Sequence, residues 1–279
     1  MSNLSVKAFF IILVFSFCSF KQQSVSWVAI GDSITYLNDH LDETGNRVTK
    51  GYLTRVQEKI PNIHYINQGH NGWTSAGIAK EIDHLGIVKA DIYSVFLGTN
   101  DWWSGVALGN EVDYDTNTGN KTHYGSFRII IDKIKALNPD AKIILITPMQ
   151  RTDFVYLTDK KNNAWGSYKE KNGQSLENFA NAIVKIGRKE KIRVIDLYHK
   201  KGMGVKSLVA FKRLKDPLTG VYKNYRYPEY IAIPFSPSDE YPYPPDAITV
   251  TYDGLHPSDK GNEMISQELV GVLKKFEIF

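Results

Sequence analysis

The sequence has little cysteine: a single residue, Cys18, among 279. One cysteine excludes a disulfide framework and the clustered thiolates that hold structural zinc. The sequence also has only a small excess of positive charge. It contains 34 lysines and arginines and 30 acidic residues, which gives a formal net charge of +4. That excess is too small to favour a nucleic-acid-binding protein. The motifs HExxH, CxxC and GxGxxG are missing, so zinc proteases and dinucleotide enzymes find no support.

Long hydrophobic runs are scarce too. The longest covers residues 8–17 (AFFIILVFSF) and follows Lys7. This run is too short to cross a bilayer, which takes about 20 residues, but it matches the hydrophobic part of a signal peptide. We therefore expect residues 1–23 to direct export to the periplasm or the medium, with a buried N-terminal strand or helix as the alternative. A lipoprotein acylated at Cys18 is a further alternative, although Phe17 stands where such a site has a small residue.

The remaining chain, residues 24–279, is predicted to be one α/β domain without a membrane span. Hydrophobic residues make up 42% of the sequence, enough for a large core. Buried strands are predicted at residues 26–31, 62–67, 91–98, 142–147 and 191–197. Helices are predicted at residues 51–60, 75–84, 124–137, 175–189 and 258–276, the last capped by Ser258. This alternation predicts a three-layer αβα sandwich around a parallel sheet of about five strands.

Three stretches interrupt the alternation: residues 101–122, 150–174 and 199–252. They are polar, rich in glycine and proline, or aromatic, and long segments of this kind tend to be functional. We expect insertions over one edge of the sheet, with a second domain as the alternative. The tyrosines of the third stretch could stack on sugar rings or line an acyl slot, or they could simply pack the insertion onto the sheet. These tyrosines are Tyr225, Tyr227, Tyr230, Tyr241 and Tyr243.

Four short motifs fall after predicted strands or before the last helix. They are Gly31-Asp32-Ser33-Ile34, the segment 67–74 (NQGHNGWT), Gly98-Thr99-Asn100-Asp101 and Asp253-Gly254-Leu255-His256-Pro257. The carboxyl edge of an open α/β sheet is where such folds build their sites. Each motif alone is weak evidence, because serine after aspartate, for example, is also a common helix cap.

In this order, the motifs GDS, NxGxxG, GTND and DxxH resemble those of the SGNH hydrolase family, the GDSL-type esterases and lipases. The resemblance runs from about residue 27 to the C-terminus, the three insertions excepted. It implies a flavodoxin-like fold and a carboxylic ester hydrolase. We expect no cofactor and no metal. One small departure is Ile34, where the family usually has leucine, and the two side chains have similar volumes.

The roles of three residues follow from chemistry as well as from the resemblance. A serine hydroxyl needs a neighbouring base, and Ser33 and His256 are the pair we expect. Asp253 precedes His256 by three residues, so its carboxylate can reach the imidazole from the same turn. It would then fix the imidazole tautomer and complete a Ser-His-Asp triad.

The developing oxyanion also needs hydrogen-bond donors. The resemblance assigns this role to the Ser33 N–H, the Gly72 N–H and the side-chain amide of Asn100. Gly69 is a rival for the second position. Three tryptophans adjoin these segments and are expected to rim a substrate pocket, with core packing as the alternative for the last two: Trp73, Trp102 and Trp103.

Other polar residues of the motifs are expected to be structural. Asp32 would order the Ser33 loop, whereas Asn67 and Asp101 would serve as turn and capping groups. Residues 113–119 alternate oxygen-bearing side chains as a calcium loop does, but the glycine falls one place late and Tyr124 stands where the bidentate glutamate belongs. A solvated loop is therefore expected.

Together these features predict an exported serine esterase that acts on a small-molecule or glycan ester, with an O-acetylated carbohydrate as the first choice. A lipase or lysophospholipase for longer acyl chains is the alternative. A catalytically inactive glycan-binding protein is another, and acyl transfer to an alcohol shares the first half-reaction. No nucleic-acid partner is expected.

Overall fold

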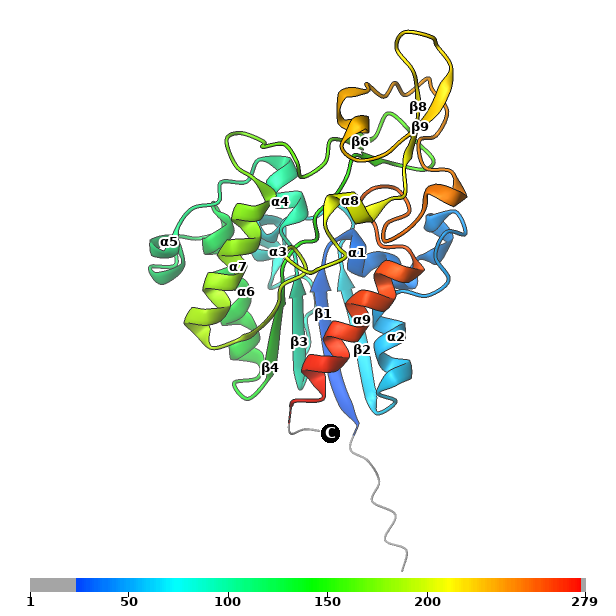
Figure 1. The fold of residues 1–279 in the computed structure, drawn as a ribbon. Helices are drawn as coiled ribbons and strands as arrows, with labels where there is room; N and C mark the ends of the chain where they lie inside the picture. Colours follow the sequence, from blue (N-terminus) through cyan, green and yellow to red (C-terminus); the bar gives the residue numbers. More distant parts are fainter. Residues whose placement is uncertain (1–23, 277–279) are drawn as a thin grey trace, which may run out of the picture.

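The computed structural model describes residues 24–276, which form a central sheet covered by helices on both faces (Figure 1). The sheet order is β2-β1-β3-β4-β7, and every neighbouring pair is parallel. The prediction of a three-layer fold with five parallel strands is confirmed. The strands are β1 (Val25–Gly31), β2 (Ile63–Gly69), β3 (Ile92–Phe96), β4 (Lys142–Ile146) and β7 (Arg193–Ile195).

The helices form two layers because β1, β3 and β4 bury side chains on both faces. In β1, Trp27 and Ala29 point to one hydrophobic cluster, and Val28 and Ile30 point to the other. The first cluster is covered by α2 (Tyr52–Lys59) and α9 (Asp259–Leu273). The second is covered by α3 (Ser75–Glu81), α6 (His123–Leu137) and α7 (Leu176–Glu190).

Local signals fix where two of these helices begin. The Ser175 hydroxyl accepts a hydrogen bond from Asn178 N at the start of α7, and the Ser258 hydroxyl accepts one from Gly261 N at the start of α9. Both serines therefore act as N-caps. Continuous burial was expected of all five strands, but this was wrong for the outer two. In β2, Ile66 is 38% exposed, because an edge strand has a neighbour on one side only.

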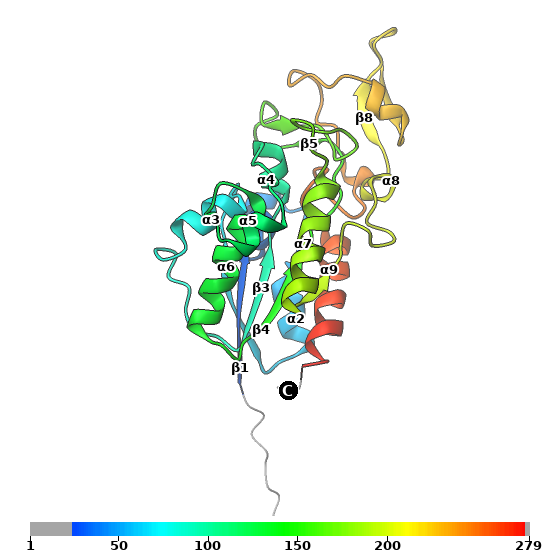
Figure 2. The same ribbon diagram turned by 90° about the vertical axis from the view of Figure 1, so that its left-hand side faces the viewer.

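The three inserted segments carry short elements of their own (Figures 1 and 2). Most of the second and third lies above the carboxyl ends of the strands, whereas the later part of the first lies at the side of the molecule, beside α6. Residues 101–122 begin inside α4 (Thr99–Ser104) and also contain α5 (Glu111–Asp115). Residues 150–174 contain the paired strands β5 (Phe154–Val155) and β6 (Asn163–Ala164). Residues 199–252 contain α8 (Val205–Leu208), the hairpin β8 (Lys212–Lys215) and β9 (Tyr222–Tyr225), and the short 3-10 helices η3 (Glu229–Ala232) and η4 (Pro245–Ala247).

The tyrosines of the third insertion pack the insertion together. Tyr230 and Tyr243 are buried in a cluster with Val155, Val209 and Leu214. Tyr225 and Tyr241 are half-buried against the same cluster, and Tyr227 is 39% exposed. The structure thus favours the packing alternative for these rings over a role in substrate stacking.

Residues 113–119 do not form the solvated loop that was expected over their whole length, because residues 113–115 belong to α5. Asp113 completes a capping box by accepting a hydrogen bond from Asn110 N at 2.8 Å. Its other oxygen accepts one from the Thr118 hydroxyl at 2.9 Å. The carboxylate therefore caps the start of α5 and also binds a residue that follows the end of this helix.

The predicted signal segment, residues 1–23 with Cys18, lies outside the described residues. Between residues 24 and 276, no helix combines the length and the apolar character needed to cross a membrane.

Candidate active site

The first and last motifs meet at the carboxyl edge of the sheet. The Ser33 Oγ lies 2.9 Å from Nε2 of His256, although 223 residues separate them in the chain. On the other side of the ring, Nδ1 lies 2.6 Å from Oδ2 of Asp253. A carboxylate can only accept, so Nδ1 carries the proton and Nε2 is left to accept the serine hydroxyl proton.

Asp253 is held in turn by backbone donors. Its Oδ1 accepts hydrogen bonds from His256 N at 2.7 Å and from Leu255 N at 3.0 Å. Burial lowers the pKa of His256, but the Asp253 charge and hydrogen bond oppose it, and the net result is a raised pKa. The imidazole is therefore a stronger base than an isolated one.

Ser33 is placed by a helix start. It is the first residue of α1 (Ser33–Tyr36), directly after β1, and the Asp32 carboxylate caps this helix by accepting from Ile34 N at 3.0 Å. Both side chains are buried. Burial raises the pKa of Asp32 to about 6, and the hydrogen bond from Ile34 and the nearby His256 oppose that rise. Asp32 thus orders the turn that presents the hydroxyl.

The expected oxyanion donors lie around the same point. Gly72 and Asn100 line one cavity with Ser33 and His256. The Asn100 amide donates one hydrogen bond to the Trp73 carbonyl oxygen at 3.0 Å, which fixes its orientation and leaves a second N–H for a ligand.

Gly69, the rival to Gly72, has a packing role. Its N–H donates to Oδ1 of Asn67 at 2.8 Å, and a Cβ built at this glycine would lie 2.1 Å from Tyr36 N. Only glycine lets β2 approach α1 this closely. Asn67 also donates to the Thr35 carbonyl oxygen at 3.0 Å, so it ties β2 to α1 as a turn group.

A buried cluster joins the two oxyanion segments. Asp101, the neighbour of Asn100, accepts hydrogen bonds from the backbone N–H and the hydroxyl of Ser75, three residues after Gly72. His123 Nδ1 lies 3.1 Å from the same carboxylate. Asp101 was expected to be a turn or capping group, and it does accept the backbone N–H of Ser75, the first residue of α3. It is also fully buried, and it joins α4 to the start of α3.

The cavity at the triad has a volume of 340 Å³. Of the three tryptophans expected around it, Trp103 lines the cavity, whereas Trp73 and Trp102 do not. Trp102 points into the protein, where it is fully buried and donates from Nε1 to the Gln174 carbonyl oxygen at 2.9 Å. Trp73 contributes its carbonyl oxygen, not its ring, to the site.

Several wall residues were not singled out in the sequence. They are Asn71, Ser104, Arg151, Phe154, Tyr156, Asn162, Ala164 and Leu255. Most belong to the 150–174 insertion, which follows the carboxyl end of β4. The rule that sites form where parallel strands end applies to β4 as well, and it could have drawn attention to this segment.

This insertion also braces the Asp253–His256 turn. Thr152 N donates to the Gly254 carbonyl oxygen at 3.0 Å, and Val155 N donates to that of Asp253 at 3.2 Å. Gly254 has a φ of +92°, and a Cβ there would lie 2.1 Å from the Asp153 carbonyl oxygen. The glycine is therefore needed both for its backbone conformation and for the close approach of the insertion.

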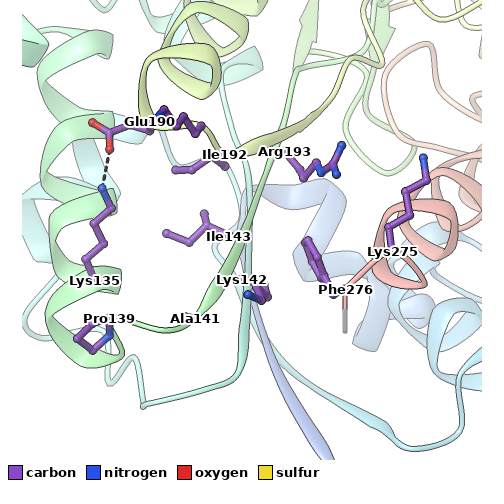
Figure 3. Close-up of a pocket in the computed structure, with 11 residues that line it drawn as sticks. Lys135, Pro139, Ala141, Lys142, Ile143, Glu190, Ile192, Arg193, Lys275 and Phe276 are labelled. Carbon is purple, nitrogen blue, oxygen red and sulfur yellow. Dashed lines mark hydrogen bonds and ion pairs between the residues drawn. The ribbon is translucent and has the colours of Figure 1, made fainter. Parts of the chain in front are cut away.

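A second hollow, of 420 Å³, lies at the amino ends of the strands, where β4 and β7 begin (Figure 3). Its polar side chains are mainly basic, and its one carboxylate, Glu190, is ion-paired with Lys135 at 2.5 Å. No serine, cysteine or histidine lines it. This hollow therefore has no nucleophile beside a base, unlike the cavity at Ser33 and His256.

The contact between Ser33 and His256, beside a positioned amide, supports acyl transfer, and it places the chain among the serine-type hydrolases of α/β fold. The model of the GDSL-like Lipase/Acylhydrolase family matches residues 29–264, most of the chain. The protein belongs to this family and is a carboxylic ester hydrolase, as the sequence predicted.

Solved structures agree with this assignment. A possible lipase from Chitinophaga pinensis is 63% identical, with a TM-score of 0.91 over 92% of this chain and 100% of that one. An acetyl xylan esterase has a TM-score of 0.52 at 17% identity, over 89% of this chain and 100% of that one. An acetyl-xylooligosaccharide esterase from a Geobacillus species has a TM-score of 0.51 at 17% identity, over 92% and 96%. At these identities, the last two show a shared fold. Comparison with curated proteins gave no match.

Proposed function

We propose that Ser33, His256 and Asp253 form the catalytic triad of an esterase that removes O-acetyl groups from carbohydrate. The observation that carries the catalytic assignment is the 2.9 Å contact between the Ser33 Oγ and Nε2 of His256. His256 would take the hydroxyl proton while Ser33 attacks the ester carbonyl carbon. Asp253 would stabilise the resulting imidazolium.

The tetrahedral oxyanion would be bound by the N–H groups of Ser33 and Gly72 and by the Asn100 amide. His256 would then protonate the leaving alcohol, which frees it and leaves an acyl-enzyme on Ser33. In the second half-reaction His256 would deprotonate a water molecule as the water oxygen attacks the acyl carbon. The bond from this carbon to the Ser33 Oγ would then break, with His256 returning the proton to Oγ, and the acid would leave. Acyl transfer to a second alcohol would follow the same path with that alcohol in place of water.

The substrate proposal depends on the walls of the cavity. Its volume of 340 Å³ is at the low end of the range for ligand pockets, about 300–1,000 Å³. Polar groups from Asn71, Asn162 and Ser104 share the wall with Phe154 and Leu255. A small acyl group on a hydroxyl-rich alcohol suits this mixture better than a long acyl chain, which would need a continuous apolar groove.

The decisive experiment combines trapping and chain length. A serine-directed fluorophosphonate should form its adduct on Ser33, and Ser33→Ala should lower kcat on 4-nitrophenyl acetate by about 10⁴-fold or more. Ser238→Ala, which changes an exposed serine outside the cavity, is the matched control and should keep wild-type rates. Equal background rates for wild type and Ser33→Ala would instead support a glycan-binding protein.

The same assay separates the two esterase candidates. Rates should fall from the acetate to the octanoate and palmitate esters. A preference for palmitate would contradict the acetyl proposal and favour a lipase.

We also propose export by means of residues 1–23, on the strength of the basic and hydrophobic pattern alone. Mass spectrometry of the protein from expressing cells should find a chain that begins shortly after residue 17. A full-length chain would contradict export, and a diacylglycerol mass on Cys18 would show a lipoprotein.

A further inference from the structure

Arg151 is the one permanently charged side chain on the wall of the triad cavity, as far as the described residues show. It follows β4 and is only 2% exposed. No aspartate or glutamate lines the same wall. A buried cation in a cavity without a facing anion is unusual, because removing a charge from water requires a compensating partner.

The hydrogen bonds of the guanidinium are incomplete. Nη2 donates to the Trp165 carbonyl oxygen at 2.9 Å, whereas the buried Nε has no partner among residues 24–276. A guanidinium carries five N–H donors, and each buried donor without a partner is costly. Nε is shielded from solvent, whereas Nη1 makes no hydrogen bond within residues 24–276 and is not among their buried unpartnered atoms. The Nη1 donors therefore remain for a group that enters the cavity.

The nearest carboxylates are already engaged. Asp153 lies 2.5 Å from Lys212 Nζ and accepts from Gly166 N at 2.8 Å. Asp253 is bonded to His256. Both stabilise the Arg151 charge from a distance, and burial nevertheless lowers the Arg151 pKa to about 10, so the group stays protonated at neutral pH.

Aromatic rings hold the guanidinium in place. Its central carbon lies 5.0 Å from the centre of the Trp103 ring and 5.1 Å from that of Trp102. Lys171 Nζ lies 3.6 Å from the Trp103 ring centre and adds a second positive charge beside the cavity. A planar, fixed guanidinium is the geometry that binds carboxylates through two parallel hydrogen bonds.

We propose that Arg151 binds a carboxylate on the alcohol part of the ester, so that the substrate is an O-acetylated acidic sugar, one that carries a uronic acid. This inference rests on the proposed esterase function and adds the charge of its substrate. A neutral ester would leave the guanidinium in a desolvated site without an anion, and would therefore be bound less well.

The test uses two chromogenic acetates that differ in one charge: 3-acetoxy-4-nitrobenzoate and its methyl ester. Wild-type protein should show a higher kcat/KM for the carboxylate, mainly through a lower KM. Arg151→Gln should lower the carboxylate-to-methyl-ester ratio by on the order of 10- to 100-fold, the loss of a charged hydrogen bond. Arg151→Lys keeps the charge without the planar fork and should give an intermediate ratio.

Arg193→Gln is the matched control, because it removes the same charge at the opposite edge of the sheet (Figure 3). Its ratio should equal that of the wild type. Thermal unfolding of each variant shows whether it is folded. If Arg151→Gln fails to fold, competitive inhibition of the wild type by glucuronate and by glucose decides. Stronger inhibition by glucuronate supports the proposal, and equal inhibition overturns it.

A parallel loss on both esters in Arg151→Gln would mean that Arg151 only supports the cavity wall, and it would overturn the inference. So would a wild-type enzyme without preference between the esters. Hydrolysis of the neutral ester that depends on Ser33 would leave the proposed esterase standing in either case. A folded wild type that hydrolyses neither ester would instead contradict the proposed function.

Discussion

Two buried carboxyl groups lie near His256, and they accept different numbers of hydrogen bonds from the protein. Asp253 accepts hydrogen bonds from the imidazole and from two backbone N–H groups. Asp32 accepts one, from Ile34 N, and its pKa is raised to about 6. Burial with so few hydrogen bonds opposes the ionisation of Asp32. The first carboxylate can thus support the imidazolium, whereas the second has a structural task at the start of α1.

The raised pKa of His256 predicts the acid limb of the pH profile. The imidazole acts as a base only when neutral, so kcat/KM should rise with pH and reach half its maximum above pH 6.5, the ordinary value for histidine. Asp253→Asn removes the charge that raises this pKa, so its midpoint should move to lower pH, with kcat reduced about 10⁴-fold. Rates on 4-nitrophenyl acetate from about pH 5 to 9 measure both. A midpoint unmoved by Asp253→Asn would contradict the contact.

The raised pKa of Asp32 predicts that Asp32→Asn stabilises the protein. Its pKa is about 6 in the folded protein against 3.8 for the free group, so the charged form is the less stable one in the fold. The penalty is absent below pH 3.8, grows between pH 3.8 and 6, and is complete above that, when it reaches about 3 kcal/mol. Asp32→Asn keeps an acceptor for Ile34 and should raise the free energy of unfolding at pH 8 by up to that amount.

Urea denaturation at pH 8 and near pH 4 tests this expectation. The gain should vanish at the lower pH, where Asp32 is protonated in the wild type. Asp140→Asn changes an exposed aspartate and serves as the control for loss of a charge. A gain of equal size at both pH values would show that ionisation of Asp32 is not its cause.

At the scale of elements, several contacts couple the third insertion to the second, and one of them is the ion pair of a buried lysine. Lys212 of β8 is fully buried, and its Nζ lies 2.5 Å from Asp153. Asp153 adjoins Thr152, whose N–H binds the carbonyl oxygen of Gly254. The third insertion therefore holds the second, and the second holds the turn that carries Asp253 and His256.

Lys212→Met should break this chain of contacts. It leaves the Asp153 carboxylate in a largely buried place without its cation, which typically lowers the free energy of unfolding by about 3–5 kcal/mol. Activity should fall as well, because the Asp253 turn loses its support. Arg213→Met, at the next residue of β8, breaks an ion pair with Glu240 in which both side chains are exposed, and it should cost less than about 1 kcal/mol. Urea denaturation compares the two, and equal losses would contradict the coupling.

At the scale of the whole molecule, the fold could be predicted because the signals were local and repeated. Apolar runs indicated the five strands of the sheet, and Ser258 marked the start of the last helix through its capping chemistry. Ser33, Asp253 and His256 could be named because short motifs carry them. Their contact needs the parallel topology that brings distant strand ends to one edge.

The cavity wall could not be predicted in the same way. Arg151, Phe154 and Tyr156 lie in an insertion without repeating pattern, and their positions depend on the β5 and β6 pairing and on contacts with the Asp253 turn. Trp102 and Trp103 are adjacent in sequence, yet one is buried and the other lines the cavity, because successive residues of a helix point about 100° apart. Which of the two points inward is decided by tertiary packing.

The sheet separates the two ends of the molecule by the length of its strands. β1 begins at Val25, and α9 ends near the same end of the sheet. Ser33 follows β1 at the opposite end, where the strands finish (Figure 1). A partner fused directly to Val25 or to the end of α9 would therefore lie at the end of the sheet opposite Ser33. Such a fusion would leave the cavity at Ser33 and His256 uncovered.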